Sequence, residues 1–342
     1  MKRRHGKVGK STLIIFALFT LILFLLESAT FHKVKTRYYE EKVAAAKLTS
    51  KCFLAIKEAK IKSGLRIDSI NDPCLTGVIG DAYSAITLYR RELDEVVWAT
   101  APNFSALLVD RLKRGGIKEG ESIGICLDGS FPGLAISCLS ACAVLKVNPF
   151  ITLSLSSNSW GANQPHFTYL DMERILREEG LSPFKTNFAS LGGEDDAGRG
   201  ISAFGRELLR LAIERNSIQL LDTGEIPQVK AGLYPQKLTF FINIGQSAAA
   251  NFLIADMREK RRKILNLSSP KKWLEKRGIK SEDLFSDIGQ GRIYVERRYS
   301  VGLAILFTAL ILVAFFLVVR YDFEYYLLPK DKREERNKEV AI

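Results

Sequence analysis

The chain has 342 residues, 47% of them hydrophobic, and its 50 Lys and Arg against 38 Asp and Glu give a formal net charge of +12. This length accommodates two average domains or one large domain. Only three histidines are present, and the five cysteines (52, 74, 126, 138 and 142) follow neither a zinc-ligand spacing nor a disulfide framework. A His/Cys metal site and a small disulfide-stapled fold are therefore excluded.

Two apolar runs lie near the ends of the chain, and Glu27 is the single charged residue within them. Residues 12–29, which begin TLIIFALFTLILFLL, and residues 301–319, VGLAILFTALILVAFFLVV, each reach the roughly 20 residues that a helix needs to cross a bilayer. We expect both to be transmembrane helices. The first could instead be a cleaved signal peptide, because MKRRHGKVGK precedes it. Its length, the Glu27 that follows and the lack of an A-x-A-type site favour a retained anchor.

Lysine and arginine residues near the spans predict the orientation. Residues 1–11 carry five of them, so we expect this tail, and with two spans also residues 320–342, to be cytoplasmic. The chain would then lie in a cell (plasma or inner) membrane, with residues 30–300 as an extracytoplasmic domain. Four aromatic residues suit an interfacial belt beside the second span: Tyr321, Phe323, Tyr325 and Tyr326.

The net positive charge is divided between the N-terminal tail and the middle domain. The N-terminal tail contributes +5 and the C-terminal tail has six charges of each sign, which leaves about +7 for the domain. A basic domain suits a polyanion or an anionic lipid surface as its partner, although solvated lysines would give the same composition. Nucleic acid is not expected, because the basic residues do not alternate with aromatic residues on the expected strands.

The middle domain is expected to begin with helices. Apolar residues recur at helical spacing over 33–63, which predicts a helical stalk leaving the membrane. A second helix is expected over 84–97, and a third, FSALLVDRLKR, after Asn103. Cys52 and Cys74 could pair if the domain is outside the cell, whereas the other three cysteines are expected to be buried thiols.

From residue 121 onward, apolar strands alternate with helices. Strands are expected over 121–127, 149–155, 185–191 and 238–244, and a helix follows each of them. This alternation predicts an α/β fold: a mostly parallel, doubly wound (Rossmann-like) sheet with helices on both faces, flanked by the two transmembrane helices.

Ligands of such sheets bind at the carboxyl ends of the strands. Four loops rich in Gly, Ser, Asp and Asn follow the expected strands, and we expect them to form one binding crevice: residues 128–133, 156–164, 192–202 and 245–247. The last of these, in NIGQSAAA, lacks both G-x-G-x-x-G and the P-loop motif, so no cofactor is expected.

Three interpretations of Ser130 compete. It could cap the helix that begins at Pro132, or it could bind an anion together with the following backbone N–H groups. It could also be a nucleophile in a Ser130–His166–Asp171 triad, although GSFPG lacks the G-x-S-x-G spacing. Thr168 and Asp171 have the spacing of a capping box, which explains Asp171 without a ligand.

Two further features of the loops have alternative explanations. Glu194, Asp195 and Asp196 lie between glycines and could bind a hard divalent cation, or they could form an exposed loop. Trp160 is set among small residues in LSSNSWGANQ, so its ring either fills a hole under the loops or forms a wall of the crevice.

Several motifs together resemble the poly-gamma-glutamate system protein family, whose members are membrane-anchored proteins of bacterial polyglutamate (capsule-type) synthesis loci. The similar stretches are NDPCLTGVIG, APNFSALLVDRLKRGGIKEGESIGICLDGSFPGLAIS, SSNSWGANQPHFTYLDMERIL and ASLGGEDDAGRGIS, within residues 65–245. The segment 251–289 is shorter and more basic than the family pattern. Asp171 is one of the motif residues, and the resemblance implies that the others bind a ligand: Asn71, Asp72, Gly77, Ser130, Phe131, Pro132, Ser159, Trp160, Gly161, Asn163, Glu173, Gly192 and Gly193.

The resemblance implies a role in making or exporting an anionic, γ-linked glutamate exopolymer. We expect an accessory protein whose crevice binds the polymer or another membrane protein of polyglutamate synthesis. The alternative is an enzyme, a hydrolase or an amide ligase or transferase, that acts on the polyglutamate chain through Ser130 or the acidic loop. A receptor for a small acidic metabolite is a third interpretation.

Overall fold

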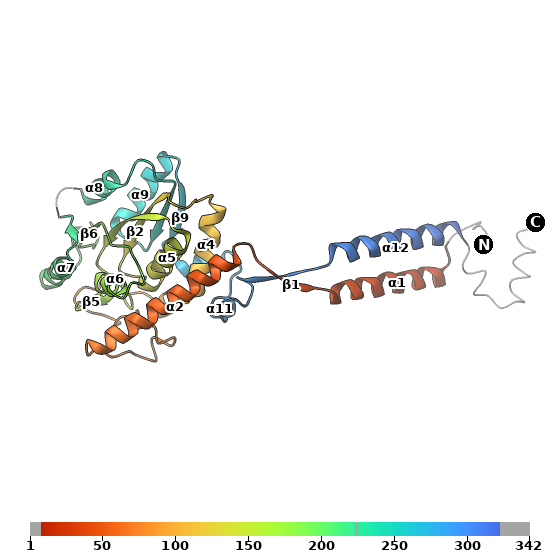
Figure 1. Ribbon diagram of the computed structural model, residues 1–342, viewed down its shortest axis with the longest axis horizontal. Coiled ribbons are helices and arrows are strands. Elements are labelled where there is room, and N and C mark those ends of the chain that lie inside the picture. Colours follow the sequence, from red (N-terminus) through yellow and green to blue (C-terminus); the bar gives the residue numbers. More distant parts are fainter. Residues whose placement is uncertain (1–7, 223–224, 322–342) are drawn as a thin grey trace, which may run out of the picture. The chain divides into compact units, whose positions relative to one another are not determined.

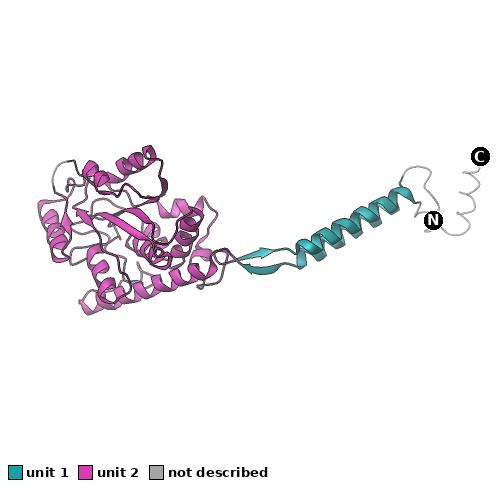
Figure 2. Cartoon of the chain, turned by 45° about the horizontal axis from the view of Figure 1, so that its top comes forward, with its two compact units in different colours: residues 1–35, 296–342 teal, residues 36–295 magenta. Residues whose placement is uncertain are grey.

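The computed structural model describes residues 8–222 and 225–321, which form two compact units (Figure 2). Unit 1 joins the two ends of the chain, residues 1–35 and 296–342. Unit 2 comprises residues 36–295 and contains the α/β part of the chain.

Unit 1 contains two candidate membrane-spanning helices, α1 (Lys10–Ala29) and α12 (Val301–Arg320). Each has 20 residues, and their mean hydropathies are 2.4 and 3.0. Length and composition therefore suffice for each helix to cross a bilayer. The helices pack against each other, with the ring centroids of Phe16 and Phe315 6.2 Å apart.

A short two-stranded sheet accompanies these helices. It pairs β1 (His32–Lys35) with β10 (Val295–Arg298). In unit 1 the guanidinium of Arg297 lies 4.7 Å from the ring centroid of Phe31. Of the expected aromatic belt, Tyr321 follows α12, and three residues lie outside the described part of the chain: Phe323, Tyr325 and Tyr326.

Unit 2 is built on a six-stranded sheet in which every neighbouring pair is parallel (Figure 1). The strand order is β7–β6–β3–β2–β8–β9. The strands are β2 (Ser122–Asp128), β3 (Asn148–Ser154), β6 (Phe188–Ser190), β7 (Gln219–Leu220), β8 (Phe240–Ile244) and β9 (Lys263–Leu267). From β2 the chain moves to one side through β3, β6 and β7, and then returns to the other side for β8 and β9. The order therefore reverses between β2 and β8.

Helices cover both faces of this sheet because its strands are apolar on both sides. One hydrophobic cluster includes Ile125 and Leu127 of β2, and a second includes Cys126 between them. The first cluster packs under α2 (Tyr39–Lys62), α4 (Asn103–Arg114), α5 (Pro132–Leu145), α6 (Tyr169–Glu178) and α7 (Ala203–Arg215). The second packs under α8 (Ile226–Leu233) and α9 (Ala248–Glu259).

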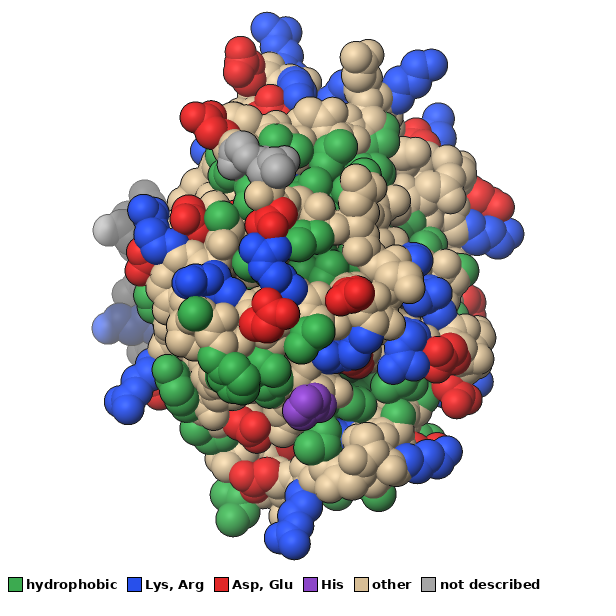
Figure 3. All heavy atoms as spheres, turned by 90° about the vertical axis from the view of Figure 1, so that its left-hand side faces the viewer, with side chains coloured by type: hydrophobic (Ala, Val, Ile, Leu, Met, Phe, Trp, Pro, Cys, Tyr) green, Lys and Arg blue, Asp and Glu red, His purple; other side chains and the backbone are tan. Residues whose placement is uncertain are grey.

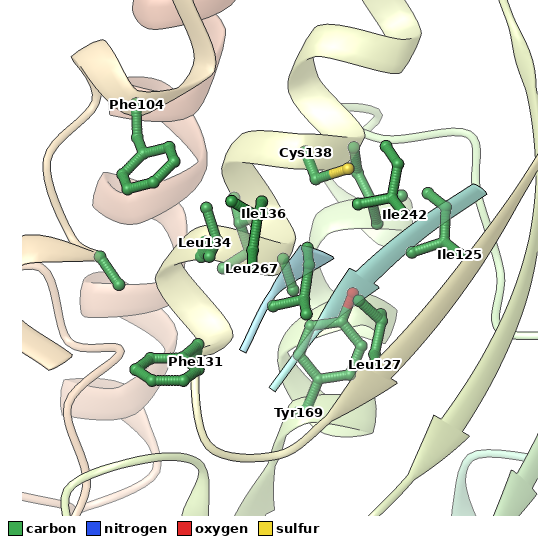
Figure 4. Packing of buried hydrophobic residues seen from close by; sticks show 14 of the residues in the cluster. Phe104, Ile125, Leu127, Phe131, Leu134, Ile136, Cys138, Tyr169, Ile242 and Leu267 are labelled. Atoms are coloured by element: carbon green, nitrogen blue, oxygen red, sulfur yellow. The ribbon is translucent and has the colours of Figure 1, made fainter. Parts of the chain in front are cut away.

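Helix α5 lies at the centre of the first cluster and is buried along almost its whole length. Figure 4 shows its side chains together with residues of the strands beneath: Phe131, Leu134, Ile136, Cys138, Ile125, Leu127 and Ile242. All five cysteines are described and free, and Cys74 is exposed whereas the others are buried. The expected buried thiols are confirmed, and Cys52 does not pair with Cys74.

The expected helical stalk over 33–63 is wrong in two respects. Residues 32–35 form β1, and helix α2 starts only at Tyr39, because Tyr38 adopts a left-handed conformation with φ of 61°. The apolar positions of α2 then pack against α4 and α5, so this helix is part of the core of unit 2.

The helix expected over 84–97 is largely absent, and only α3 (Leu93–Trp98) is helical there. Ser84 and Thr87 provide a local reason, because the hydroxyl of Thr87 accepts the backbone N–H of Ser84 at 2.8 Å and so competes with helical hydrogen bonds. The remaining short elements of unit 2 are β4 (Asn163–Gln164), β5 (Phe167–Thr168), α10 (Pro270–Glu275) and α11 (Ser281–Leu284).

A fully buried ion pair connects α8 to the carboxyl ends of β3 and β6. The ammonium of Lys230 lies 2.7 Å from a carboxylate oxygen of Asp196, and both side chains are completely buried. Lys230 also donates to the hydroxyls of Ser154 and Ser190, at 2.9 and 2.8 Å. Because every charged atom here has a partner, the pair can exist inside the domain without an unpaired charge.

Replacing Lys230 by Met should reduce the free energy of unfolding by about 3–5 kcal/mol, because the carboxylate of Asp196 would be left buried and unpaired. Lys230→Met combined with Asp196→Asn should recover a large part of this loss, since the double variant buries no charge. Urea unfolding of the three proteins measures both effects. If the double variant is no more stable than Lys230→Met, the loss in Lys230→Met does not come from an unpaired Asp196 carboxylate.

Candidate functional site

The four loops at the carboxyl ends of the strands lie side by side, as the sequence predicts. The backbone N–H of Ala162 donates to the carbonyl of Gly129 at 2.8 Å, and that of Asn158 donates to the hydroxyl of Ser130 at 3.1 Å. The N–H of Gly193 donates to the hydroxyl of Ser156 at 2.9 Å. These bonds join the loops after β2, β3 and β6 to one another.

The loops fill the space where a crevice was expected. A Cβ atom on Gly161 would lie 2.7 Å from the carbonyl oxygen of Gly129 in the loop after β2, and one on Gly192 would lie 2.1 Å from the hydroxyl oxygen of Ser156 in the loop after β3. Both distances are shorter than any real contact, so glycine is required by the close approach of the loops. The small residues of these motifs therefore serve packing of backbone against backbone.

Residues 80–91, which we call the strap, cross over the loop that follows β3. The N–H of Leu88 donates to the carbonyl of Ser157 at 2.8 Å, and Ser157 in turn donates to Ile86. The N–H of Trp160 donates to the carbonyl of Asp81 at 2.8 Å. The strap thus pairs with residues far away in the sequence, which is why helical periodicity did not predict its conformation.

The side-chain amide of Asn163 binds the strap to the loop after β3. Its amide oxygen accepts the N–H of Asp81 at 2.8 Å, and its amide nitrogen donates to the carbonyl of Asp81 and the hydroxyl of Thr87, at 2.7 and 2.9 Å. The side chain is fully buried. Asn163, which the resemblance assigns to ligand binding, is therefore engaged in holding two loops together.

The carboxylate of Asp128 occupies the point where the strand order reverses. One oxygen accepts the N–H of Gln246 at 2.6 Å, in the turn between β8 and α9, and the other accepts the N–H of Ser130 at 2.8 Å. Burial raises the pKa of this carboxyl, and the hydrogen bond from Gln246 and the charge of Arg91 oppose the rise. At this place in related sheets, backbone N–H groups bind an anionic ligand. Here the protein's own carboxylate takes that role.

An open pocket remains beside the strap. Its volume is about 580 Å³, which is within the range of small-molecule sites. Seven residues line it: Ala82, Tyr83, Arg90, Arg91, Glu92, Ser159 and Trp160. The pocket therefore lies between the two ends of the strap and the loop after β3.

Figure 3 shows one face of unit 2, where Lys and Arg side chains are interspersed with Asp and Glu. On this face the positive charge is therefore distributed and does not form one patch.

Arg91 is held rigidly in the wall of this pocket. Its side chain is only 7% exposed and pairs with Glu95 at 2.8 Å. Its guanidinium lies 4.4 Å from the ring centroid of Phe131, and its Nε–H has no hydrogen-bond partner among the described residues. A stacked, ion-paired arginine loses little freedom when it binds an anion. Arg90 adds a second, exposed cation.

Trp160 forms the other wall. Its side chain is partly buried and packs against the core cluster, and the residue lines the pocket. Its φ of 66° lies in the left-handed region, which a bulky residue rarely adopts. The backbone bonds of Trp160 to Gly80 and Asp81 hold it in this conformation. Trp160 therefore combines features of the two roles considered for it, since it packs on the core and also lines the pocket.

Of the remaining ligand residues implied by the resemblance, Ser159 lines the pocket and donates its N–H to the carbonyl of Tyr89, whereas the others are used internally. Phe131 and Pro132 are buried at the start of α5. Asn71 and Asp72 stabilise the loop after α2, where a carboxylate oxygen of Asp72 accepts the N–H of Gly77 at 2.7 Å.

The buried side chain of Lys60 also stabilises the loop after α2. Its ammonium donates to the carbonyls of Gly77 and Ile79 at 3.0 and 2.8 Å. Burial lowers the pKa of Lys60, against the attraction of nearby carboxylates. The NDPCLTG motif therefore builds a loop on α2, and it does not contribute to the pocket beside the strap.

The two acidic residues of the LDME motif have different partners. Glu173 accepts the N–H and the hydroxyl of Thr186, at 2.8 and 2.6 Å, in the turn that precedes β6. It therefore lies toward the amino end of that strand, away from the loops. Asp171 forms the expected capping box with Thr168, and it also binds Arg215.

The Ser130–His166–Asp171 triad is not assembled. The hydroxyl of Ser130 accepts the N–H of Asn158, and the oxygens of Asp171 are taken by Thr168, Arg215 and Asn216. His166 is exposed. Within the described residues no hydrogen bond connects any two members of the triad.

The three acidic residues of GGEDDAG are all bound within the protein, two of them to Arg199. Glu194 pairs with Arg199 and accepts the hydroxyl of Tyr89, whereas Asp195 accepts the N–H groups of Ala197 and Arg199. Asp196 is buried against Lys230. Among residues 8–222 and 225–321, no group of three or more His, Cys, Asp or Glu is placed to hold a metal ion.

Sequence reasoning missed Arg90 and Arg91, because the segment that contains them was expected to be helical. The available signal was the pair of adjacent arginines between Tyr89 and Glu92. Comparison with known protein families and with characterised proteins found no match. The pocket therefore has to be interpreted from its own chemistry.

The strain at Trp160 gives a direct prediction. Trp160→Gly should be more stable than Trp160→Ala by about 1 kcal/mol, because glycine adopts a φ of 66° without the cost that a Cβ atom brings. Urea unfolding measures the difference. The matched control is Ser159, whose φ is not positive, so Ser159→Gly should be less stable than Ser159→Ala. If the Gly variant is the more stable one at both positions, or at neither, backbone strain at Trp160 is refuted.

Asp171 gives a prediction for pH. Burial alone would raise its pKa, but hydrogen bonds from Arg215 and Asn216 outweigh it, and the pKa is lowered from the ordinary value of 3.8. A lowered pKa stabilises the folded state above the unfolded pKa, and this stabilisation is lost as pH falls through the folded pKa.

Asp171→Asn should therefore cost about 2 kcal/mol at neutral pH, in line with lost hydrogen bonds to a charged group. The difference from the wild type should shrink below pH 3.8. Unfolding at several pH values measures this. Glu178→Gln, an exposed change on the same helix, should have little effect, and a pH-independent cost of Asp171→Asn would show that its charge is unimportant.

Proposed function

We propose that this protein is a membrane-anchored accessory component of poly-γ-glutamate (capsule or exopolymer) synthesis or export, and that the pocket beside the strap binds an anionic segment of the polymer. The observation that carries the proposal is the pair Arg90 and Arg91 in a pocket walled by Tyr83 and Trp160. The sequence motifs supply the polymer's identity by resemblance, and the pocket supplies chemistry that fits it.

A γ-linked glutamate chain offers one carboxylate per residue on a backbone of amides and methylene groups. Guanidinium groups bind carboxylates through paired N–H donors, and this geometry is stronger and more specific than a simple ion contact. The rings of Tyr83 and Trp160 can cover the methylene and amide parts of the chain. The pocket therefore matches both halves of the repeating unit.

A binding role is favoured over catalysis by the state of the candidate catalytic groups. Ser130 is buried, and its hydroxyl is occupied by a backbone N–H. The acidic loop is also occupied, because Glu194 pairs with Arg199, Asp195 accepts the N–H of Ala197 and Asp196 pairs with Lys230. An accessory protein needs only the pocket, whereas a hydrolase or amide ligase would also need an available nucleophile or base.

The proposal includes the arrangement in the membrane. We infer that unit 2 belongs to the doubly wound, Rossmann-like class, which the reversal of strand order between β2 and β8 supports. The two apolar helices α1 and α12 would anchor it in the cell membrane, with both termini cytoplasmic and unit 2 outside. From there, unit 2 would meet the polymer and other membrane proteins of polyglutamate synthesis.

Arg90→Gln should weaken binding of poly-γ-glutamate by about tenfold, the effect of losing one hydrogen-bonded charge contact. Arg90 is exposed, so folding should be little affected. The measurement is the affinity of the full chain for purified polymer at fixed ionic strength. The matched control is Arg66→Gln, which removes the same charge from an exposed position outside the pocket.

Two results would count against the proposal. If Arg66→Gln weakens binding as much as Arg90→Gln, the polymer is attracted by net charge and the pocket has no special role. If deletion of the gene leaves the amount and length of the exported polymer unchanged, the protein does not serve this pathway.

A further inference from the structure

A second cavity lies at the amino ends of the strands, whereas the pocket beside the strap lies at their carboxyl ends. It is formed by residues that precede β8 and β9, and so it lies at the amino ends of these parallel strands. Its volume is about 390 Å³. It is therefore separate from the loops that follow the strands, and the proposed polymer site does not use it.

The floor of this cavity is apolar and firmly held. Tyr234, Leu238 and Met257 line it, and all three are otherwise buried in the second hydrophobic cluster. The hydroxyl of Tyr234 donates to the carbonyl of Ile125 at 2.9 Å and bonds the hydroxyl of Thr152 at 2.7 Å. The floor is thus tied to two central strands, which preserves its shape when the cavity is empty.

Cations line the rim of the cavity. Lys260 pairs with Asp256 at 2.7 Å, and a guanidinium N–H of Arg262 donates to the carbonyl of Gln236, which also lines the cavity. Lysine is common at helix C-termini for electrostatic reasons, so Lys260 alone would mean little. The second cation, Arg262, is fixed by its bond to another lining residue, and this distinguishes the rim.

The end of α9 places Arg262 at the cavity. The N–H of Arg262 donates to the carbonyl of Met257 at 2.9 Å, and that of Arg261 donates to Arg258 at 2.9 Å, the two bonds of a Schellman motif. Arg261 has a φ of 53° at the position where glycine is usual. The motif holds Arg262 directly beyond Met257, so that the cationic rim and the apolar floor keep a fixed separation.

We infer that this cavity binds an amphiphilic anion, a phosphate or carboxylate carried on a short aliphatic chain. The anionic group would lie between Lys260 and Arg262, where two donors with charge are available. The chain would lie against Leu238 and Met257, which an isolated inorganic anion would leave uncovered. Such a ligand is either the head of an anionic lipid or a free alkyl phosphate or fatty acid.

The test uses the full chain in nanodiscs of neutral phosphatidylcholine, titrated by calorimetry with inorganic phosphate, ethyl phosphate and butyl phosphate. Affinity should rise along this series by up to about fourfold per methylene, because each buried methylene contributes about 0.8 kcal/mol. Equal affinity for the three probes would overturn the inference, because it would show that the apolar floor takes no part.

Two variants separate the cavity from general positive charge. Arg262→Gln should weaken butyl phosphate binding by about tenfold, the effect of losing a charged hydrogen bond. Arg261→Gly removes an adjacent charge that does not line the cavity and keeps the left-handed backbone, so it should change affinity by less than about twofold. Equal losses in both variants would sink the proposal, and unfolding temperatures of both check that they fold.

Competition distinguishes the two sources of the ligand. Vesicles of phosphatidylcholine with phosphatidylglycerol should displace butyl phosphate if the natural ligand is a lipid headgroup, whereas vesicles of phosphatidylcholine alone should not. If neither displaces it while butyl phosphate still binds more tightly than inorganic phosphate, the ligand is a free amphiphilic anion. These outcomes do not depend on polyglutamate binding at the strap.

Discussion

Close approach of backbone to backbone at the carboxyl ends of the strands is the constraint on which the rest of unit 2 depends. Gly161 allows the loop after β3 to approach Gly129 in the loop after β2, and Gly192 allows the loop after β6 to approach Ser156. Asn163 then binds the strap to these loops, and a pocket stays open between the strap and the loop after β3. The positions of Arg90, Arg91 and the pocket follow from this arrangement.

The parts of the fold that could be predicted are those governed by local patterns. Continuous apolar runs identified β2, β3 and β8, which are buried on both faces. The edge strand β9 escaped prediction because KILNL exposes Lys263 and Asn266 and lacks such a run. Lys230 could not have been paired with Asp196, since 34 residues separate them and lysine is rarely buried.

In the candidate site, too, local patterns could be predicted from the sequence, whereas contacts between distant residues could not. Glycine, serine and asparagine in SSNSWGAN indicated correctly that loops meet at this edge, but the same residues suit a ligand and a close backbone contact equally well. Only the structure separates these roles. It shows that Ser130 and Asn163 form hydrogen bonds between loops, and that Trp160 and the two arginines line the pocket. The strap's hydrogen bonds join residues about 70 or more positions apart, and no helical or strand period records such contacts.

The internal carboxylate of Asp128 has a consequence for how this fold can diversify. A side chain tethered to β2 competes for the N–H of Gln246 at a high effective concentration, whereas a diffusing phosphate must pay the full entropy of association. The domain therefore carries an internal competitor at the position where open parallel α/β sheets usually bind ligands. The exposed Arg90 at the strap has no carboxylate partner among the described residues, so a new anion site can arise more readily there.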